Sequence, residues 1–143
     1  MEENTIVPDK IKLFNIDVIN TYINDDTITD NLNLEFSVAH NTKHNLEKER
    51  VKIELFINLL SNNDIGVKYH IDFHYTIEDL KDQYQLNKDN KAVFSGQFIA
   101  TLIGISFSTA RGLIFQQLQD TKFKGMILPI VSPYKMLISR NNE

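Results

Sequence analysis

The sequence predicts an α+β fold: a four-stranded antiparallel sheet with a long helix near the C-terminus packed on one face. Two patterns support this prediction. Three segments between residues 32 and 77 alternate apolar and polar side chains with the two-residue period of a half-buried strand. The segment 95–121 instead has apolar side chains at helical spacing, and its only charge before Asp120 is Arg111. With 143 residues, the chain is expected to form a single domain, 1–143.

Residues 11–23 are predicted as the first strand. Their apolar side chains change phase, with Ile11 and Leu13 on one face and Phe14, Ile16 and Val18 on the other. An irregular phase is typical of an edge strand or of a strand with a bulge. The Asn- and Asp-rich segment 21–30 is expected to form a turn.

Three regular strands follow, and their apolar sets form the predicted inner face of the sheet. These sets are Leu32, Leu34, Phe36 and Val38; Val51, Ile53, Leu55, Ile57 and Leu59; and Val67, Tyr69, Ile71, Phe73, Tyr75 and Ile77. The predicted hairpin connections are residues 40–49 and 61–66, so His40 and His44 are expected to be solvated loop residues. His70 and His74 are predicted about 13 Å apart on the polar face of one strand, too far apart to share an ion. No metal site is predicted.

The helix predicted at 95–121, with Ser95 as its N-cap, is apolar over more than half of its circumference. If such a helix packs on one sheet only, apolar side chains on its opposite side remain exposed to water. A second subunit is therefore expected to cover it. Small residues recur at every fourth position and are expected to allow close approach: Gly96, Ala100, Gly104, Ser108 and Gly112. A membrane span needs about 20 predominantly apolar residues. Polar side chains interrupt this segment, so no membrane insertion is predicted.

The segment after the helix, residues 126–131, is apolar and contains Pro129, which argues against both a central strand and a helix interior. A run of large apolar side chains in an irregular segment needs a cover or a ligand. A last helical turn is predicted from Ser132 and Pro133 onward. Arg111, the lone charge of the long helix, is expected to form an ion pair with an acid of a neighbouring element.

Composition excludes several classes of function. The formal net charge is −4 and the lysines and acids are interspersed, so there is no basic stripe for nucleic acid. The absence of cysteine excludes disulfide and thiol chemistry and fits a cytoplasmic protein. Neither a catalytic pair of carboxylates nor a glycine-rich phosphate loop is evident, so the chain is predicted to be no enzyme and to use no cofactor.

The order of elements resembles SecB and the SecB-like export chaperones, including those associated with toxin–antitoxin systems. The resemblance extends from about Ile11 to Leu137. Its most specific part is Thr109-Ala110-Arg111-Gly112, followed at a fixed gap by Leu128-Pro129-Ile130. In that family an alanine–arginine step late in the helix also precedes an apolar, proline-containing tail at the same spacing.

The resemblance implies a single SecB-like domain that acts as an ATP-independent holdase for unfolded polypeptides. It implies a homotetramer, a dimer of dimers with its helices between two sheets. The client groove would have Ile16, Val18, Tyr22 and Ile23 on one wall and Met126, Ile127, Leu128 and Ile130 on the other. Asp17 and Asp72, on the outer face of the sheet, would bind the translocase motor SecA, and an antitoxin is the other implied partner.

Hydrophobic alternation alone also fits a second class, a domain in which a curved sheet and a long helix enclose a small apolar ligand without catalysis. The tail discriminates between the two classes. An exposed, elongated groove favours peptides, whereas a closed cavity of roughly a few hundred cubic ångströms favours a small ligand.

Overall fold

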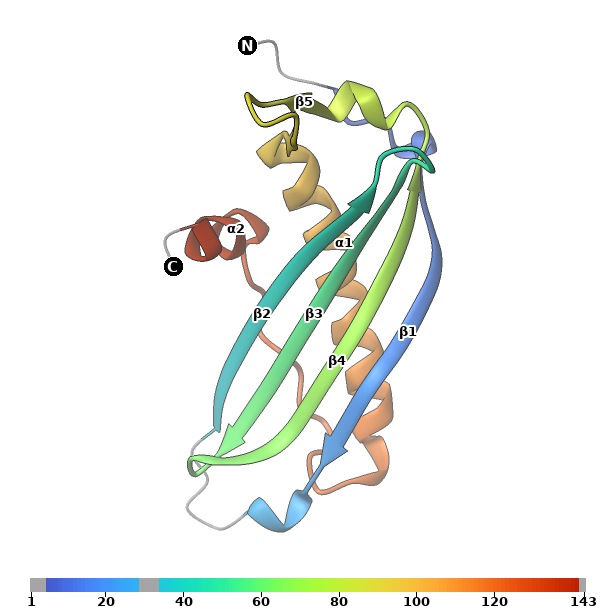
Figure 1. Cartoon of the computed structure of the whole chain (residues 1–143). Coiled ribbons are helices and arrows are strands. Elements are labelled where there is room, and N and C mark those ends of the chain that lie inside the picture. Colours follow the sequence, from blue (N-terminus) through green and yellow to red (C-terminus); the bar gives the residue numbers. More distant parts are fainter. Residues whose placement is uncertain (1–4, 29–33, 142–143) are drawn as a thin grey trace.

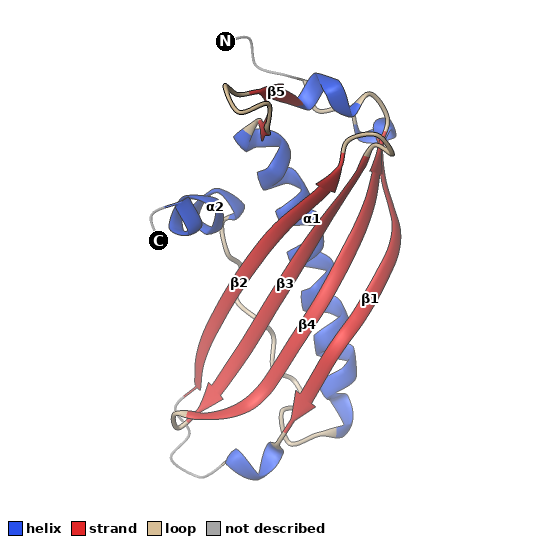
Figure 2. Ribbon diagram, viewed as in Figure 1, coloured by secondary structure: helices blue, strands red, loops and turns tan. Residues whose placement is uncertain are grey.

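The computed structural model describes residues 5–28 and 34–141, which form a curved antiparallel sheet with a long helix across one face (Figure 1, Figure 2). The strands are β1 (Ile11–Ile23), β2 (Leu34–Asn45), β3 (Arg50–Ser61), β4 (Asp64–Ile77), β5 (Tyr84–Leu86) and β6 (Ala92–Phe94). The α-helices are α1 (Gly96–Gln117) and α2 (Pro133–Asn141), and short 3₁₀ helices occur at η1 (Pro8–Lys10), η2 (Asp25–Thr27), η3 (Leu80–Gln83) and η4 (Leu118–Asp120). The predicted α+β class is confirmed.

The four long strands are ordered β1-β4-β3-β2, and every neighbouring pair is antiparallel. β1 and β2 are consecutive in the chain but form opposite edges of the sheet. Leu32, which the sequence places in the second strand, lies outside the described residues.

The inner face of the sheet is the core of the molecule. The predicted apolar sets of β3 and β4 are all buried, and α1 lies across them with Leu102 and Ile103 fully buried. Burial of one such side chain stabilises the fold by about 1.5–3 kcal/mol. The hydrophobic face of the sheet is thus where alternation predicts it.

A polar pair is buried within this apolar layer. The Tyr75 hydroxyl lies 2.7 Å from Ser106 Oγ and 3.3 Å from the carbonyl oxygen of Leu102, both on α1. Burial raises the pKa of Tyr75 to about 12. The hydroxyl group is therefore protonated and fixes the position of β4 relative to α1.

β1 is an edge strand with two irregularities, as its phase predicts. Its register with β4 shifts between Leu13 and Asn15 and again between Val18 and Asn20. The first shift turns Phe14 to the outer face, where its ring lies 6.0 Å from that of His74 and under the Arg50 guanidinium at 5.1 Å. The prediction that Phe14 shares a face with Ile16 and Val18 is wrong, because a bulge inserts one residue.

β2 is longer than the alternation predicts. It pairs with β3 as far as Asn45, so His40 and His44 belong to the ladder, and the turn is confined to residues 46–49, with Glu49 at φ 55°. The inward positions at this end of β2 are His40, Thr42 and His44. Alternation stops at these polar residues while backbone pairing continues, which explains why the prediction of a loop is wrong.

The helix ends follow the predicted signals. Ser95 Oγ accepts a hydrogen bond of 3.1 Å from the backbone N–H of Phe98 and caps α1. α2 begins at Pro133, as predicted. The segment that connects β4 to α1, residues 78–95, contains η3 and the β5–β6 hairpin. Leu80 of η3 is buried in the core.

Candidate functional site

The tail between the two α-helices, residues 121–132, is fixed to the core. Phe123 and Leu128 are both buried. Nε of Arg111 donates a hydrogen bond of 2.9 Å to the carbonyl oxygen of Leu128. Among the described residues Arg111 therefore binds a backbone carbonyl, and the expected ion pair with an acid is wrong. This contact gives a physical reason for the fixed gap between the arginine and the Leu-Pro-Ile segment.

The same tail exposes two isoleucines. Ile127 is 65% exposed and Ile130 is 85% exposed, whereas Leu128 between them belongs to the core and Met126 is half-buried. Pro129 has no backbone N–H and keeps the tail from joining the sheet as a strand. Of the predicted tail wall, Ile127 and Ile130 are thus available to a partner, and Leu128 is structural.

α2 is fixed to β2 through His40, whose ring is buried. His40 Nε2 lies 3.1 Å from the carbonyl oxygen of Met136. Because a carbonyl only accepts hydrogen bonds, Nε2 carries the proton. His40 is therefore an anchor for α2 rather than the solvated residue predicted.

Gly104 of α1 leaves room for Pro133, the first residue of α2, to pack closely against the helix. A Cβ atom at Gly104 would lie 3.2 Å from Pro133 Cγ. Within the chain, a close approach is thus made at this glycine, and the approach of a second subunit there stays a prediction.

The predicted wall on β1 is split between the two faces of the sheet. Ile16, Val18 and Ile23 pair with inward-facing residues of β4, whereas Tyr22 pairs with Lys68 on the outer face. Ile16, Val18 and Tyr22 are each 36–46% exposed. The structure thus brings three of the four side chains to the helix-covered face and places Tyr22 on the opposite one.

The segments that follow β1 and precede the tail wall are joined to each other. The backbone N–H of Lys122, at the start of the tail, donates a hydrogen bond of 2.9 Å to Asp25 Oδ2 of η2, and its ammonium lies 3.8 Å from Asp26 Oδ1. Ile23 lies at this end of β1. From there the tail leads to α2, which packs on β2, while β1 follows the opposite edge (Figure 1). The tail and β1 are therefore close where η2 meets Lys122 and lead from there to opposite edges of the sheet.

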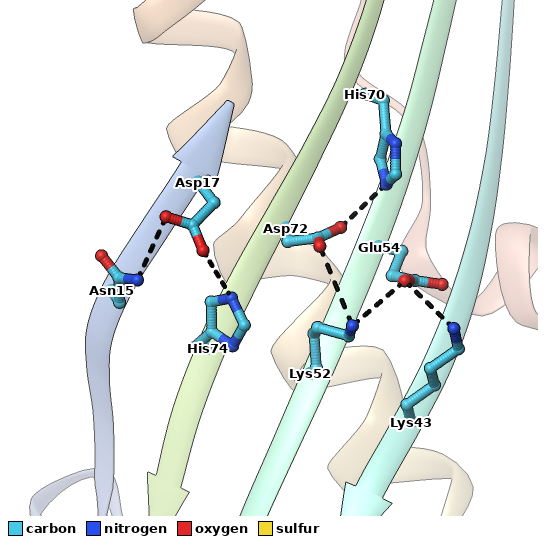
Figure 3. Close-up of polar contacts among 8 residues, drawn as sticks. All are labelled: Asn15, Asp17, Lys43, Lys52, Glu54, His70, Asp72 and His74. Carbon is cyan, nitrogen blue, oxygen red and sulfur yellow. Dashed lines mark hydrogen bonds and ion pairs between the residues drawn. The ribbon is translucent and has the colours of Figure 1, made fainter. Parts of the chain in front are cut away.

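The outer face of the sheet carries a network of ion pairs (Figure 3). Glu54 and Asp72 are direct cross-strand partners, and Asp72 also pairs with Asp17 of β1. Lys52 Nζ lies 3.3 Å from Glu54 Oε2 and 3.8 Å from Asp72 Oδ2, and Lys43 Nζ lies 3.4 Å from Glu54 Oε2. Both carboxylates of the central strands are buried, although no other element covers this face in the described chain.

Two histidines complete the network. His70 Nε2 lies 2.8 Å from Asp72 Oδ1, and the His70 ring stacks on Phe56 with centroids 4.3 Å apart. His74 Nε2 lies 3.0 Å from Asp17 Oδ2. The two acids assigned to translocase binding thus share the outer face, but Asp72 is enclosed by its partners and Asp17 is half-exposed.

The lysines determine the charge state of Glu54. Burial alone raises the pKa of its carboxyl group, but the hydrogen bonds and charges of Lys52 and Lys43 outweigh burial and hold the pKa below the ordinary value of 4.5. Sequence reasoning considered the two histidines of β4 only as a pair. It therefore missed the cluster of Glu54, His70 and Asp72, which forms because strand pairing places Glu54 beside Asp72.

The side of α1 that faces away from the sheet, called here the back of α1, is partly apolar and exposed to solvent. Ile105 is 38% exposed and Phe115 is 37% exposed. A recess of about 630 Å³ lies beside Ile105, between α1 and the start of α2. The segment 96–120 is long and apolar enough to cross a membrane by length and composition alone, yet half of its most apolar window is buried inside the protein.

No protein-family model matches the sequence, and no curated protein matches it significantly. Among solved structures, the chain is similar to the SecB-like chaperone Rv1957 of Mycobacterium tuberculosis, solved in complex with a ChAD peptide from the antitoxin HigA1. The two are 8% identical, with a TM-score of 0.57 over 87% of this chain and 89% of that chain. A protein of unknown function from Streptococcus agalactiae is 12% identical, with a TM-score of 0.45 over 84% of this chain and 97% of that chain. The first of these similarities shows that this chain has a SecB-like fold.

Proposed function

We propose that the protein is an ATP-independent holdase chaperone that binds unfolded polypeptides along its tail. The observation that carries this proposal is the pair of highly exposed isoleucines, Ile127 and Ile130, on a tail fixed by Arg111 and Leu128. Exposed apolar patches on a folded surface mark interaction sites, and these two isoleucines lie three residues apart on the tail. Extended chains bind such surfaces through buried apolar area with little sequence preference. The Mycobacterium tuberculosis neighbour, which holds a peptide, supports the same class of ligand.

The clients we propose are unfolded segments of exported proteins or of an antitoxin, bound in the cytoplasm. Binding of this kind is driven by removal of apolar surface from water, so it needs neither nucleotide nor another cofactor. The antitoxin peptide in the neighbouring structure supports the second kind of client.

We further propose a homotetramer, assembled as a dimer of dimers. Support comes from the apolar residues that the single chain leaves exposed at two places: Ile105 and Phe115 on the back of α1, and Ile16 and Ile19 on the edge strand β1. Second copies of the chain would cover both places. Light scattering near neutral pH is expected to report a tetramer, or at least a dimer. A stable monomer at micromolar concentration contradicts this assembly.

The holdase proposal is tested by aggregation of a chemically unfolded, unrelated client in the absence of nucleotide. Wild-type protein is expected to suppress aggregation, and Ile127→Ser combined with Ile130→Ser to weaken the suppression. Each lost side chain removes about 1.5–3 kcal/mol of possible contact. The matched control is Leu86→Ser combined with Val93→Ser, which also removes two exposed apolar side chains, but from the β5–β6 hairpin. This control is expected to behave as wild type.

Three outcomes separate the alternatives. Equal loss in both double variants points to general surface hydrophobicity rather than to the tail. Unfolding of the tail variant shows that its isoleucines belong to the core. Failure of the wild-type protein to slow aggregation contradicts the holdase proposal and favours the small apolar ligand-binding domain.

A further inference from the structure

The outer face of the sheet brings three metal-ligand side chains together. Glu54, His70 and Asp72 each offer one ligand atom, and these atoms lie within 4.8 Å of one another. They project from the two central strands, β3 and β4, whose pairing fixes their backbones. The stack of His70 on Phe56 also orients the imidazole ring. Side chains held on rigid elements are the usual basis of a defined coordination site.

A cation already lies between the two carboxylates. The ammonium of Lys52 is 3.3 Å from Glu54 and 3.8 Å from Asp72. Both distances exceed the 2.7–2.9 Å that is typical of a charge-assisted hydrogen bond. Adjacent buried carboxylates require a compensating charge, but Lys52 supplies it with long contacts. Its side chain is 28% exposed and can turn toward solvent.

We propose that Glu54, Asp72 and His70 form a transition-metal site, and that Zn²⁺ takes the place of the Lys52 ammonium. Two carboxylate oxygens and one imidazole nitrogen suit Zn²⁺, whereas Mg²⁺ and Ca²⁺ select oxygen ligands. Tetrahedral bonds to Zn²⁺ place ligand atoms about 3.4 Å apart. The ligand atoms lie within 4.8 Å of one another, so rotation of the side chains is expected to bring them to this separation, and the ion displaces the proton that His70 Nε2 shares with Asp72 Oδ1. A three-ligand site leaves a fourth position for water or for a donor atom of a partner.

The surrounding charges determine how tightly the ion is held. Lys43 also approaches Glu54, but its side chain is 63% exposed, so both lysines can withdraw from the ion. The nearby pair of Asp17 and His74 has the same chemistry, a carboxylate oxygen 3.0 Å from an imidazole nitrogen. This pair provides a matched control on the same face.

Titration calorimetry of tag-free, metal-free protein with Zn²⁺ alone tests the site. One ion per chain is expected, and Glu54→Gln or His70→Asn is expected to weaken binding at least about tenfold, because even outer-shell partners of a metal contribute 10–100-fold. Lys52→Met is expected to tighten binding about tenfold or more, since it removes a unit charge near the ion. Asp17→Asn removes a charge beside Asp72 but no ligand, so it is expected to weaken binding less than either ligand variant.

The Lys52→Met variant distinguishes binding at the proposed site from adventitious binding. The affinity of an ion bound elsewhere is not raised by this substitution. Circular dichroism checks that this variant is folded; if it is not, the contrast between His70→Asn and Asp17→Asn decides. Co²⁺ in place of Zn²⁺ is expected to give the absorption bands of a four-coordinate site, and these bands are expected to disappear in His70→Asn. Binding that survives in both Glu54→Gln and His70→Asn, or no binding by wild-type protein, overturns the proposal.

Discussion

The two faces of the sheet bury side chains of the same strands by different means. The inner face is apolar and is covered by α1, whereas the outer face has no covering element in the described chain yet buries Glu54 and Asp72 among lysines and histidines. Apolar burial is non-directional and depends on area. Buried charge depends on specific partners at specific distances. The inner face should therefore be sensitive to lost volume, and the outer face to the loss of a single charge.

The largest effect is expected from removal of volume on the inner side. Leu102→Ala should lower the free energy of unfolding by about 2–5 kcal/mol, because it leaves a cavity in a fully buried layer. The matched control is Ile105→Ala on the same helix, expected within about 0.5 kcal/mol of wild type in a single chain. Urea unfolding measures both variants. A large loss in the control would show that the back of α1 is also buried, as the proposed oligomer requires.

The outer face should respond to a charge. Lys52→Met is expected to cost about 1–3 kcal/mol at pH 7 in metal-free buffer, because it removes the charge that contacts both buried carboxylates and leaves Lys43 for Glu54 and His70 for Asp72. The pKa of Glu54 is lowered by the lysines, so their stabilisation is present above pH 4.5 and is lost as the pH falls through the lower folded value. The difference between variant and wild type should therefore shrink in acid. A difference that is the same at pH 3 and pH 7 would contradict this account.

A smaller effect is expected where a polar group interrupts the inner face. Tyr75→Phe should cost about 0.5–1.5 kcal/mol, because it removes the hydrogen bond to Ser106. Burial raises the pKa of Tyr75 to about 12, so its protonated form is stabilising below pH 10 and this contribution is lost as the pH rises through 12. Unfolding between pH 9 and pH 12 should show less alkaline loss in the variant. Equal loss in both proteins would assign the alkaline transition to other groups.

The smallest effect on stability is expected at the exposed margin of the outer face. Asp17→Lys should change the free energy of unfolding by less than about 1 kcal/mol, because the carboxylate is half-exposed. We propose that Asp17 takes part in docking on the translocase motor SecA, so the variant should bind the motor more weakly and with less dependence on salt. Binding at low salt measures this. Wild-type protein that shows no such binding removes the docking proposal and leaves the chaperone proposal intact.

Alternation predicted the inner face because apolar area determines which side of β3 and β4 is covered. It failed in β2, where His40, Thr42 and His44 occupy inward positions without an apolar pattern. It also failed at Phe14, because the irregular phase indicates a bulge but not which residue the bulge turns to the other face. Local pattern therefore predicts a strand only while the same face stays apolar.

The candidate site was predicted less completely than the fold. The tail was found from its run of apolar residues, but the run itself does not distinguish buried Leu128 from exposed Ile127 and Ile130. That distinction depends on the long-range contact between Arg111 and the Leu128 carbonyl. The outer network was missed for a similar reason, since Glu54 and Asp72 meet only through strand pairing.

The tail is held at Phe123 in the core and at Leu128 through Arg111, and α2, which follows it, is held at Met136 through His40. Ile127 and Ile130 lie on the short segments between these points. A segment fixed at both ends has lost most of its backbone entropy before any ligand arrives, so little remains to be lost on binding. The isoleucine side chains keep their rotamer freedom and can adapt to different partners. The tail thus combines a low entropic cost of binding with tolerance of unlike sequences.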